Sequence, residues 1–176
     1  MWLYAAGTAW AVGPVVGWGA GTAPGVDASS VAVGSGSYGC AILVDSGAVV
    51  CWGRNFIGES TPPPPAVNGA AGTASAIAAA LYHTCAIQSG TGAAVCWGRD
   101  LFGEGTPPAA VNGTEGSARA IAVGSGHGCA VQSETDAVIC WGADYDGQAT
   151  PPDLVNGSAG TASAIAVGDG HSCAIQ

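Results

Sequence analysis

Short apolar segments alternate along most of the chain with segments rich in Gly, Pro, Ser and Thr. The segments Cys85–Gln88 and Ala94–Trp97 flank a Gly-Thr turn at residues 90–91, which is the pattern of a β-hairpin. A symmetric register about this turn places Cys85 opposite Cys96 and gives the hairpin two apolar faces. A hairpin with one solvent-exposed face would alternate apolar and polar positions. The pattern therefore predicts sheets that are covered by other protein segments on both faces.

The same pattern recurs with a period of about 44 residues, so internal repetition dominates the sequence. Each copy has an apolar run, a cysteine, a Trp-Gly pair, and then Thr-Pro-Pro and Val-Asn-Gly segments that interrupt regular structure. The Trp-Gly pairs begin at Trp18, Trp52, Trp97 and Trp141. We therefore expect a single all-β repeat domain over residues 1–176, with copies at approximately 18–51 (shortened), 52–96, 97–140 and 141–176, and residues 1–17 as a terminal strand that completes a blade.

Small sheets with two apolar faces are stable when they stack and cover one another, as in propellers and solenoids. We expect one four-stranded sheet per copy in a β-propeller-like array of about four blades. The tryptophans of the four Trp-Gly pairs are expected in the core.

Two segments carry a resemblance to a known family: Cys51–Glu59, which reads Cys-Trp-Gly-Arg-Asn-Phe-Ile-Gly-Glu, and Ile121–Val131, which reads Ile-Ala-Val-Gly-Ser-Gly-His-Gly-Cys-Ala-Val. With the Thr-Pro-Pro segment they resemble the regulator of chromosome condensation repeat in its short bacterial form. The resemblance covers roughly residues 15–176 and implies a β-propeller, usually of seven blades. Members serve as exchange factors, photoreceptors, enzyme inhibitors and scaffolds, so the resemblance implies a fold rather than a function. A secreted bacterial β-lactamase inhibitor with a similar repeat acts through aromatic loop residues.

Four copies are too few for a ring of seven blades. Pro14–Trp18 has the pattern of a returning hairpin strand, and His171–Gln176 has that of an outgoing one, so the two ends are complementary. Three arrangements stay open: a four-bladed ring within one chain, a larger ring or open filament of several chains, or a piece of a longer propeller.

Six of the seven cysteines fall into pairs that the hairpin register sets directly opposite each other: Cys40 and Cys51, Cys85 and Cys96, Cys129 and Cys140. Opposed Cα atoms of antiparallel strands lie within disulfide range, so the register predicts three disulfides and an oxidising compartment. The alternative is small buried thiols that fill the core. Cys173 is expected to be a free thiol, because Gly17 occupies the matching position.

Composition narrows the function classes. Charged residues make up 9% of the chain, the net charge is −9, and there is no lysine. We therefore expect no nucleic-acid binding, because affinity for nucleic acids comes largely from Lys and Arg. No apolar stretch is long enough to span a membrane, and the opening Met1–Ala6 lacks the positive charge of a signal peptide. So little charge indicates either a surface of small polar residues or a surface buried against other subunits.

Candidate chemistry is sparse. A His-X-Cys motif occurs three times, at His83, His127 and His171. We expect no metal site there because no Cys-X-X-Cys accompanies it, and no Cys–His catalysis because an active site is normally single. Asp144–Gly147 resembles the start of a calcium loop but lacks further ligands, so a self-capping turn is favoured. Asn112 and Asn156 begin glycosylation sequons, although the third copy of this turn is not a sequon and the turn alone explains Asn-Gly.

We therefore predict no enzyme, no cofactor and no catalytic residue. The favoured function is an extracellular or cell-surface module that binds another protein, and the alternative is a structural subunit that assembles with copies of itself. A candidate contact surface consists of aromatic residues in the loops, which dominate many interfaces, although packing between blades would explain them equally well. These residues are Tyr38, Phe56, Tyr82, Phe102 and Tyr145.

Overall fold

The computed structural model describes residues 12–18, 23–61 and 64–176. Within these ranges every regular element is a β-strand, so the all-β prediction is confirmed. The twelve strands are β1 Gly13–Pro14, β2 Asp27–Gly34, β3 Tyr38–Leu43, β4 Val49–Gly53, β5 Ala74–Ala79, β6 His83–Gln88, β7 Ala94–Gly98, β8 Ala118–Val123, β9 His127–Gln132, β10 Val138–Gly142, β11 Ala164–Val167 and β12 Ser172–Ile175.

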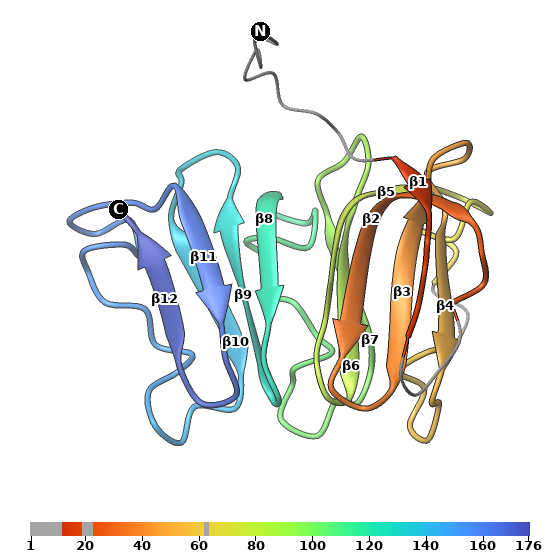
Figure 1. Ribbon diagram of the computed structural model, residues 1–176. Coiled ribbons are helices and arrows are strands. Elements are labelled where there is room, and N and C mark those ends of the chain that lie inside the picture. The colour runs from red at the N-terminus through yellow and green to blue at the C-terminus, as the bar shows by residue number, and fades with distance from the viewer. Residues whose placement is uncertain (1–11, 19–22, 62–63) are drawn as a thin grey trace, which may run out of the picture.

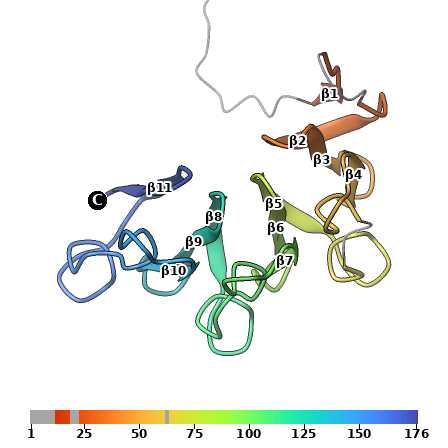
Figure 2. The ribbon, with the colours of Figure 1, turned by 90° about the horizontal axis from the view of Figure 1, so that it is seen from below.

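The strands form four small antiparallel sheets, ordered β1-β2-β3-β4, β5-β6-β7, β8-β9-β10 and β11-β12. Figures 1 and 2 show these sheets side by side in an open arc, with β2, β5, β8 and β11 along its inner side. The first and last sheets lie at opposite ends of the arc and do not meet. This arrangement is that of an incomplete propeller, which confirms the predicted fold class.

The middle two sheets have three strands and the last has two, so the expectation of four strands in every copy was wrong. The first sheet reaches four only because β1 joins it. The Thr-Pro-Pro and Val-Asn-Gly segments form turns instead of an outer strand, because proline has no amide to donate to a ladder. In three copies a backbone hydrogen bond joins the turn segment to the outer edge of the sheet, and its acceptor is the carbonyl of a valine. The amide of Val49 donates to the Val67 carbonyl, that of Ala94 to the Val111 carbonyl, and that of Val138 to the Val155 carbonyl. All three of these carbonyl-bearing valines are buried, so the turn segment still closes the outer edge of each blade.

The hairpin register follows the prediction. Cys40 lies opposite Cys51, Cys85 opposite Cys96 and Cys129 opposite Cys140. The sulfur atoms of each pair are joined, at S–S distances of 2.06, 2.02 and 2.05 Å. Cys173 is a free, exposed thiol.

The core lies between the blades and is built mainly from small side chains of the middle strands. Cys85, Ala86 and Ile87 of β6 are buried, and the matching residues of β3 and β9 are buried as well. Both faces of the hairpin are therefore covered, as the two apolar faces predicted. Alanine and cysteine allow neighbouring sheets to approach closely.

The tryptophans of the Trp-Gly pairs do not share one environment. Trp141 is buried and Trp52 and Trp97 are half-buried, but Trp18 is 89% exposed, so its assignment to the core was wrong. The terminal strand also differs from the expected one. Among residues 12–18 regular structure is confined to Gly13–Pro14, which pairs with the start of β2 on the inner side of the sheet. Met1–Ala6 lie outside the described residues.

Candidate protein-interaction surface

Three loops of equivalent sequence follow the outer strands β4, β7 and β10 and lie along the same edge of the sheets, the lower edge in Figure 1. Each begins with an Asn or Asp that caps its own loop. Asp100 accepts hydrogen bonds from the Gly105 amide and the Thr106 hydroxyl, both at 2.8 Å. Asn55 and Asp144 make the same two bonds in their loops. The favoured interpretation of Asp144–Gly147 as a self-capping turn is therefore correct.

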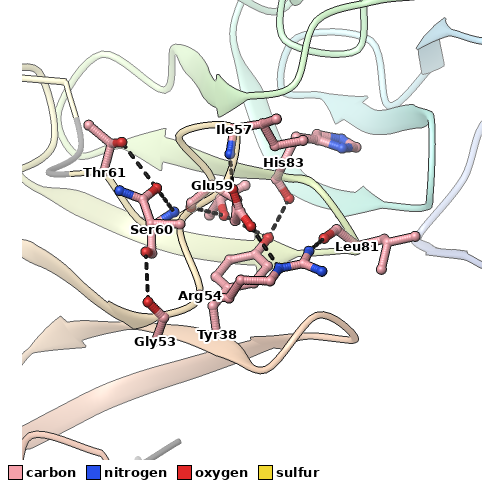
Figure 3. A network of polar contacts seen from close by, with 11 residues as sticks. Tyr38, Gly53, Arg54, Ile57, Glu59, Ser60, Thr61, Leu81 and His83 are labelled. Carbon is pink, nitrogen blue, oxygen red and sulfur yellow. Dashed lines mark hydrogen bonds and ion pairs between the residues drawn. The ribbon is translucent and has the colours of Figure 1, made fainter.

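A buried ion pair fixes the first of these loops to the next blade. The Arg54 guanidinium donates from Nε to Glu59 at 2.8 Å and from Nη2 to the carbonyl of Leu81 in the turn between β5 and β6. Glu59 is fully buried and also accepts the Ile57 amide at 2.8 Å, as Figure 3 shows. The main chain approaches the guanidinium so closely at Gly36 that any side chain there would collide with Arg54.

The second loop repeats this arrangement. Arg99 pairs with the fully buried Glu104 and donates to the carbonyl of Ser125 in the turn between β8 and β9. Glu104 accepts the Phe102 amide at 2.7 Å. Each of these two loops is thus closed on itself by its cap and bonded to the following blade by its arginine.

Burial acts to raise the pKa of Glu59, but hydrogen bonds from the amides of Ile57, Glu59 and Phe56 and from Arg54 outweigh it, so the pKa lies below its ordinary value. The pKa of Glu104 is lowered by the same kind of contacts against the same opposing effect of burial. Both carboxylates are therefore ionised in neutral solution, where a buried charge is tolerated only with such partners.

The third loop has lost both charges together. Ala143 stands where the other loops have arginine, and Gln148 stands where they have glutamate. The Gln148 side chain still accepts a hydrogen bond from the backbone amide two residues earlier, that of Asp146, at 2.8 Å, as the glutamates do in the other loops. This paired replacement is a sequence signal for the ion pair that the sequence analysis missed.

Aromatic rings and guanidinium groups form a continuous row above these ion pairs. The Arg54 guanidinium lies 5.7 Å from the Phe56 ring centroid and 5.1 Å from that of Tyr82. Arg99 lies 4.7 Å from Tyr82 and 5.5 Å from Phe102. The Phe102 ring then meets Tyr145 edge to face at 5.7 Å. Contacts of this kind each contribute about 0.5–1.5 kcal/mol and hold the rings in place.

The outward side of this row is a ridge of exposed apolar residues. We call it the ridge, and it consists of Phe56, Ile57, Leu101, Phe102 and Tyr145. Phe56, Leu101 and Tyr145 occupy equivalent positions and are 84, 76 and 77% exposed. Ile57 and Phe102 occupy the next position and are each 43% exposed.

The candidate contact residues divide between this ridge and the interior. Phe56, Phe102 and Tyr145 lie in the ridge, and Tyr82 is half-buried between Arg54 and Arg99. Tyr38 is buried, and its hydroxyl donates to the His83 carbonyl at 2.8 Å, so it does not belong to a contact surface. Leu101 and Ile57 were missed because only aromatic residues were considered. Aligning the loops on Asn55, Asp100 and Asp144 would have found them.

Two histidines lie fully buried between the blades near the inner turns. The ring of His127 contacts the Ser172 hydroxyl at 3.0 Å through Nε2. His83 has Gly128 at the corresponding place in the next blade, and neither of its ring nitrogens has a hydrogen-bond partner in the described part of the chain. Burial lowers the pKa of His83 to about 4. His83 is therefore neutral at neutral pH.

Gly128 has a packing reason for lacking a side chain. A Cβ atom at this position would lie 2.8 Å from the Trp141 ring. Trp141 uses that space to donate from Nε1 to the Glu104 carbonyl at 3.1 Å. In the preceding blade Thr84 donates to the equivalent carbonyl of Glu59 at 3.2 Å instead, and Trp97 is left half-buried.

Two of the three His-X-Cys motifs have no cysteine available as a ligand, and in the third Cys173 is a free, exposed thiol. Cys85 and Cys129 are joined in disulfides, so their sulfurs are not available as thiolates. No group of three His, Cys, Asp or Glu side chains that could hold a metal occurs in the described ranges.

Comparison with known proteins defines the class of fold. No family model matches the sequence, and no curated protein matches it. Among solved structures, the ectodomain of the receptor kinase CR4 from Physcomitrella patens aligns with a TM-score of 0.67 at 23% identity over 88% of this chain and 37% of that one. The CRINKLY WD40 ectodomain of the Arabidopsis thaliana receptor kinase ACR4 aligns with a TM-score of 0.60 at 23% identity, over 85% of this chain and 46% of that one.

A further solved structure ties the fold to the expected repeat. Prp20p of Saccharomyces cerevisiae, the yeast RCC1, aligns with a TM-score of 0.59 at 17% identity, over 82% of this chain and 42% of that one. The fold is therefore that of an RCC1-like propeller. The chain spans less than half the length of each of these three proteins. In the described residues no helix is long and apolar enough to cross a membrane.

Proposed function

We propose that this chain is a non-catalytic extracellular repeat module that binds another protein through the ridge. The observation that carries the proposal is the row of exposed apolar residues at equivalent positions of three successive loops, with Phe56, Leu101 and Tyr145 each at least 76% exposed. Aromatic and large apolar side chains on an accessible surface are the usual centre of protein interfaces.

The support beneath the ridge favours binding over incidental exposure. The Arg54–Glu59 and Arg99–Glu104 pairs fix two of the loops, and Phe102 connects the second loop to Tyr145 in the third. A surface that is already ordered loses little conformational entropy when a partner docks. Two of the similar structures are receptor-kinase ectodomains, and Prp20p has binding properties toward Gsp1p and histones, so interaction is a common use of this fold.

The proposed extracellular location rests on the cysteines. Three disulfides within hairpins persist in oxidising compartments and are rare in the cytosol. We further propose that the repeats are of the short bacterial form, with copies running from one Trp-Gly pair to the next.

A peptide selection tests the proposed function. A phage-displayed random peptide library is selected on the intact chain and counter-selected on the triple variant Phe56→Ser, Leu101→Ser, Tyr145→Ser. We expect peptides that bind the chain and fail to bind the variant. A variant with serine at Val44, which is exposed and lines neither of the grooves at the two ends of the arc, is the control and should retain binding. If every recovered peptide binds the ridge variant and the intact chain equally, the ridge is not the interaction surface.

A second candidate function is self-assembly, and the open ends of the arc favour it. At one end, a groove on the last sheet is lined by Val138, Leu154 and Cys173, and most of β12 is exposed. At the other end, Trp18, Val31 and Val33 line a second groove. Size-exclusion chromatography with light scattering separates the two functions. A mass that rises with concentration supports self-assembly, and a concentration-independent monomer argues against it.

A further inference from the structure

The charge of the three ridge-bearing loops changes in steps along the arc. In the first loop Arg54 and Glu59 cancel, and the cap is the neutral Asn55. In the second loop the cap is Asp100, which adds one negative charge to another cancelling pair.

The third loop is the most acidic. Asp144 and Asp146 flank Tyr145, and both are exposed. Ala143 and Gln148 occupy the positions of the ion pair, so no cation offsets them. The formal charge of the loops therefore runs from zero through one negative charge to two.

The turn between β11 and β12 extends this acidic end. A Cβ atom at Gly170 would lie 3.9 Å from the Asp146 carboxylate, which places that carboxylate beside the turn carrying the exposed Asp169. Asp169 is held by the Ser125 hydroxyl at 2.7 Å. The apolar ridge thus ends among three exposed carboxylates.

The chain has no free arginine or lysine to balance them. The chain has three arginines and no lysine, and all three arginines form ion pairs: Arg54, Arg99 and Arg119. A second copy of the chain would also carry a net charge of −9, so long-range repulsion disfavours it as the occupant of the ridge. A partner with the opposite charge would be attracted instead.

We propose that the ridge takes a lysine- or arginine-bearing segment of another protein. The cationic side chains of this segment lie against Tyr145 and its flanking aspartates, and its apolar side chains lie against Phe56 and Leu101. The aromatic face of Tyr145 and the two carboxylates attract a cation together, through the ring quadrupole and through direct charge. This inference rests on the proposed function, because it assigns the chemistry of the partner to the same ridge.

Two synthetic peptides of matched apolar content probe the charge preference directly. One is three repeats of Lys-Gly-Leu-Gly and the other is three repeats of Glu-Gly-Leu-Gly. Each is titrated into the isotopically labelled chain while amide chemical shifts are recorded by NMR. We expect the lysine peptide to shift the amides of residues 100–103 and 144–147, with an affinity that falls as salt is added. The glutamate peptide should shift none of them.

The charge variants identify the site. Asp144→Asn with Asp146→Asn should weaken binding of the lysine peptide about tenfold, because both carboxylates that flank Tyr145 lose their charge. The first substitution reproduces the Asn55 cap of the first loop, so the loop should still form. The control, Asp27→Asn with Asp45→Asn, removes the same charge at the opposite end of the sheets and should leave the affinity within twofold. Equal losses in both variants would mean nonspecific attraction and would overturn the proposal.

The failure of this inference can be told apart from that of the proposed function. If the peptide selection recovers ridge-dependent sequences that are neutral or acidic, the ridge is an interaction surface but its partner is not cationic. If the selection recovers no ridge-dependent sequence, the proposed function itself fails. Ridge-dependent sequences enriched in Lys and Arg support both.

Discussion

The paired replacement of Arg and Glu by Ala and Gln in the third loop leads to a double-mutant prediction for the first loop. Arg54→Ala removes the ion pair to Glu59, the bond to the Leu81 carbonyl, and the stacking on Tyr82, and it leaves a fully buried carboxylate without its counter-charge. Removing one member of a buried pair costs about 3–5 kcal/mol, and because Arg54 is partly exposed we expect a cost of about 3 kcal/mol. Adding Glu59→Gln should restore about half of this loss, because the third loop shows that glutamine satisfies the neighbouring amide.

Urea unfolding of the wild type, both single variants and the double variant at pH 7 measures this cycle. The exposed pair Arg119–Asp136 is the matched control, and Arg119→Ala should cost no more than about 1 kcal/mol. The pKa of Glu59 should rise in Arg54→Ala, since burial then acts with less opposition, so the cost should shrink as the pH falls and the carboxyl takes up a proton. The reasoning is refuted if Arg54→Ala costs no more than Arg119→Ala, or if the double variant is no more stable than Arg54→Ala.

Three further predictions concern the rest of the molecule. The pKa of His83 is about 4 in the folded chain and about 6.5 in the unfolded chain, so the fold loses stability as the pH falls from 6.5 toward 4 and the unfolded chain takes up a proton first. His83→Leu should reduce the difference in unfolding free energy between pH 8 and pH 4 by about 3 kcal/mol. An unchanged pH profile in urea unfolding would contradict this. Each disulfide closes a loop with a sequence separation of 11, so reduction should cost about 3 kcal/mol per bridge, and thiol titration of the unfolded, unreduced chain should find one thiol rather than seven. Replacing the exposed Phe56, Leu101 and Tyr145 by serine should leave the thermal midpoint within a few degrees, whereas a large drop would show that these side chains hold the blades together.

Local sequence patterns were sufficient for the strands and for the hairpin register. The symmetric turn at residues 90–91 placed Cys85 opposite Cys96, and the two apolar faces correctly indicated that each hairpin is covered on both sides. Repetition made these inferences firm, since each was repeated in several copies. The number of strands per sheet was not predictable in the same way, because the segment that contains Val67 contacts the outer strand through a turn instead of forming a fourth strand.

Contacts between blades were the part that the sequence pattern did not reveal. Arg54 and Leu81 are far apart in the chain, and nothing local indicates that the guanidinium reaches the next blade. Tyr38 was grouped with exposed aromatics because its position between a turn and a cysteine looks accessible, yet its hydroxyl bonds into the neighbouring sheet. Trp18 shares the Trp-Gly motif of the buried Trp141 but lacks the surrounding sheet, so it is exposed.

A crystal structure of the chain with a peptide recovered in the ridge-dependent selection tests the central claim most directly. The account predicts a peptide that lies across Phe56, Leu101 and Tyr145, with a lysine or arginine side chain beside Asp144 or Asp146. A peptide bound instead along β12, or at the end of the sheets that carries Asp27 and Asp45, would contradict it.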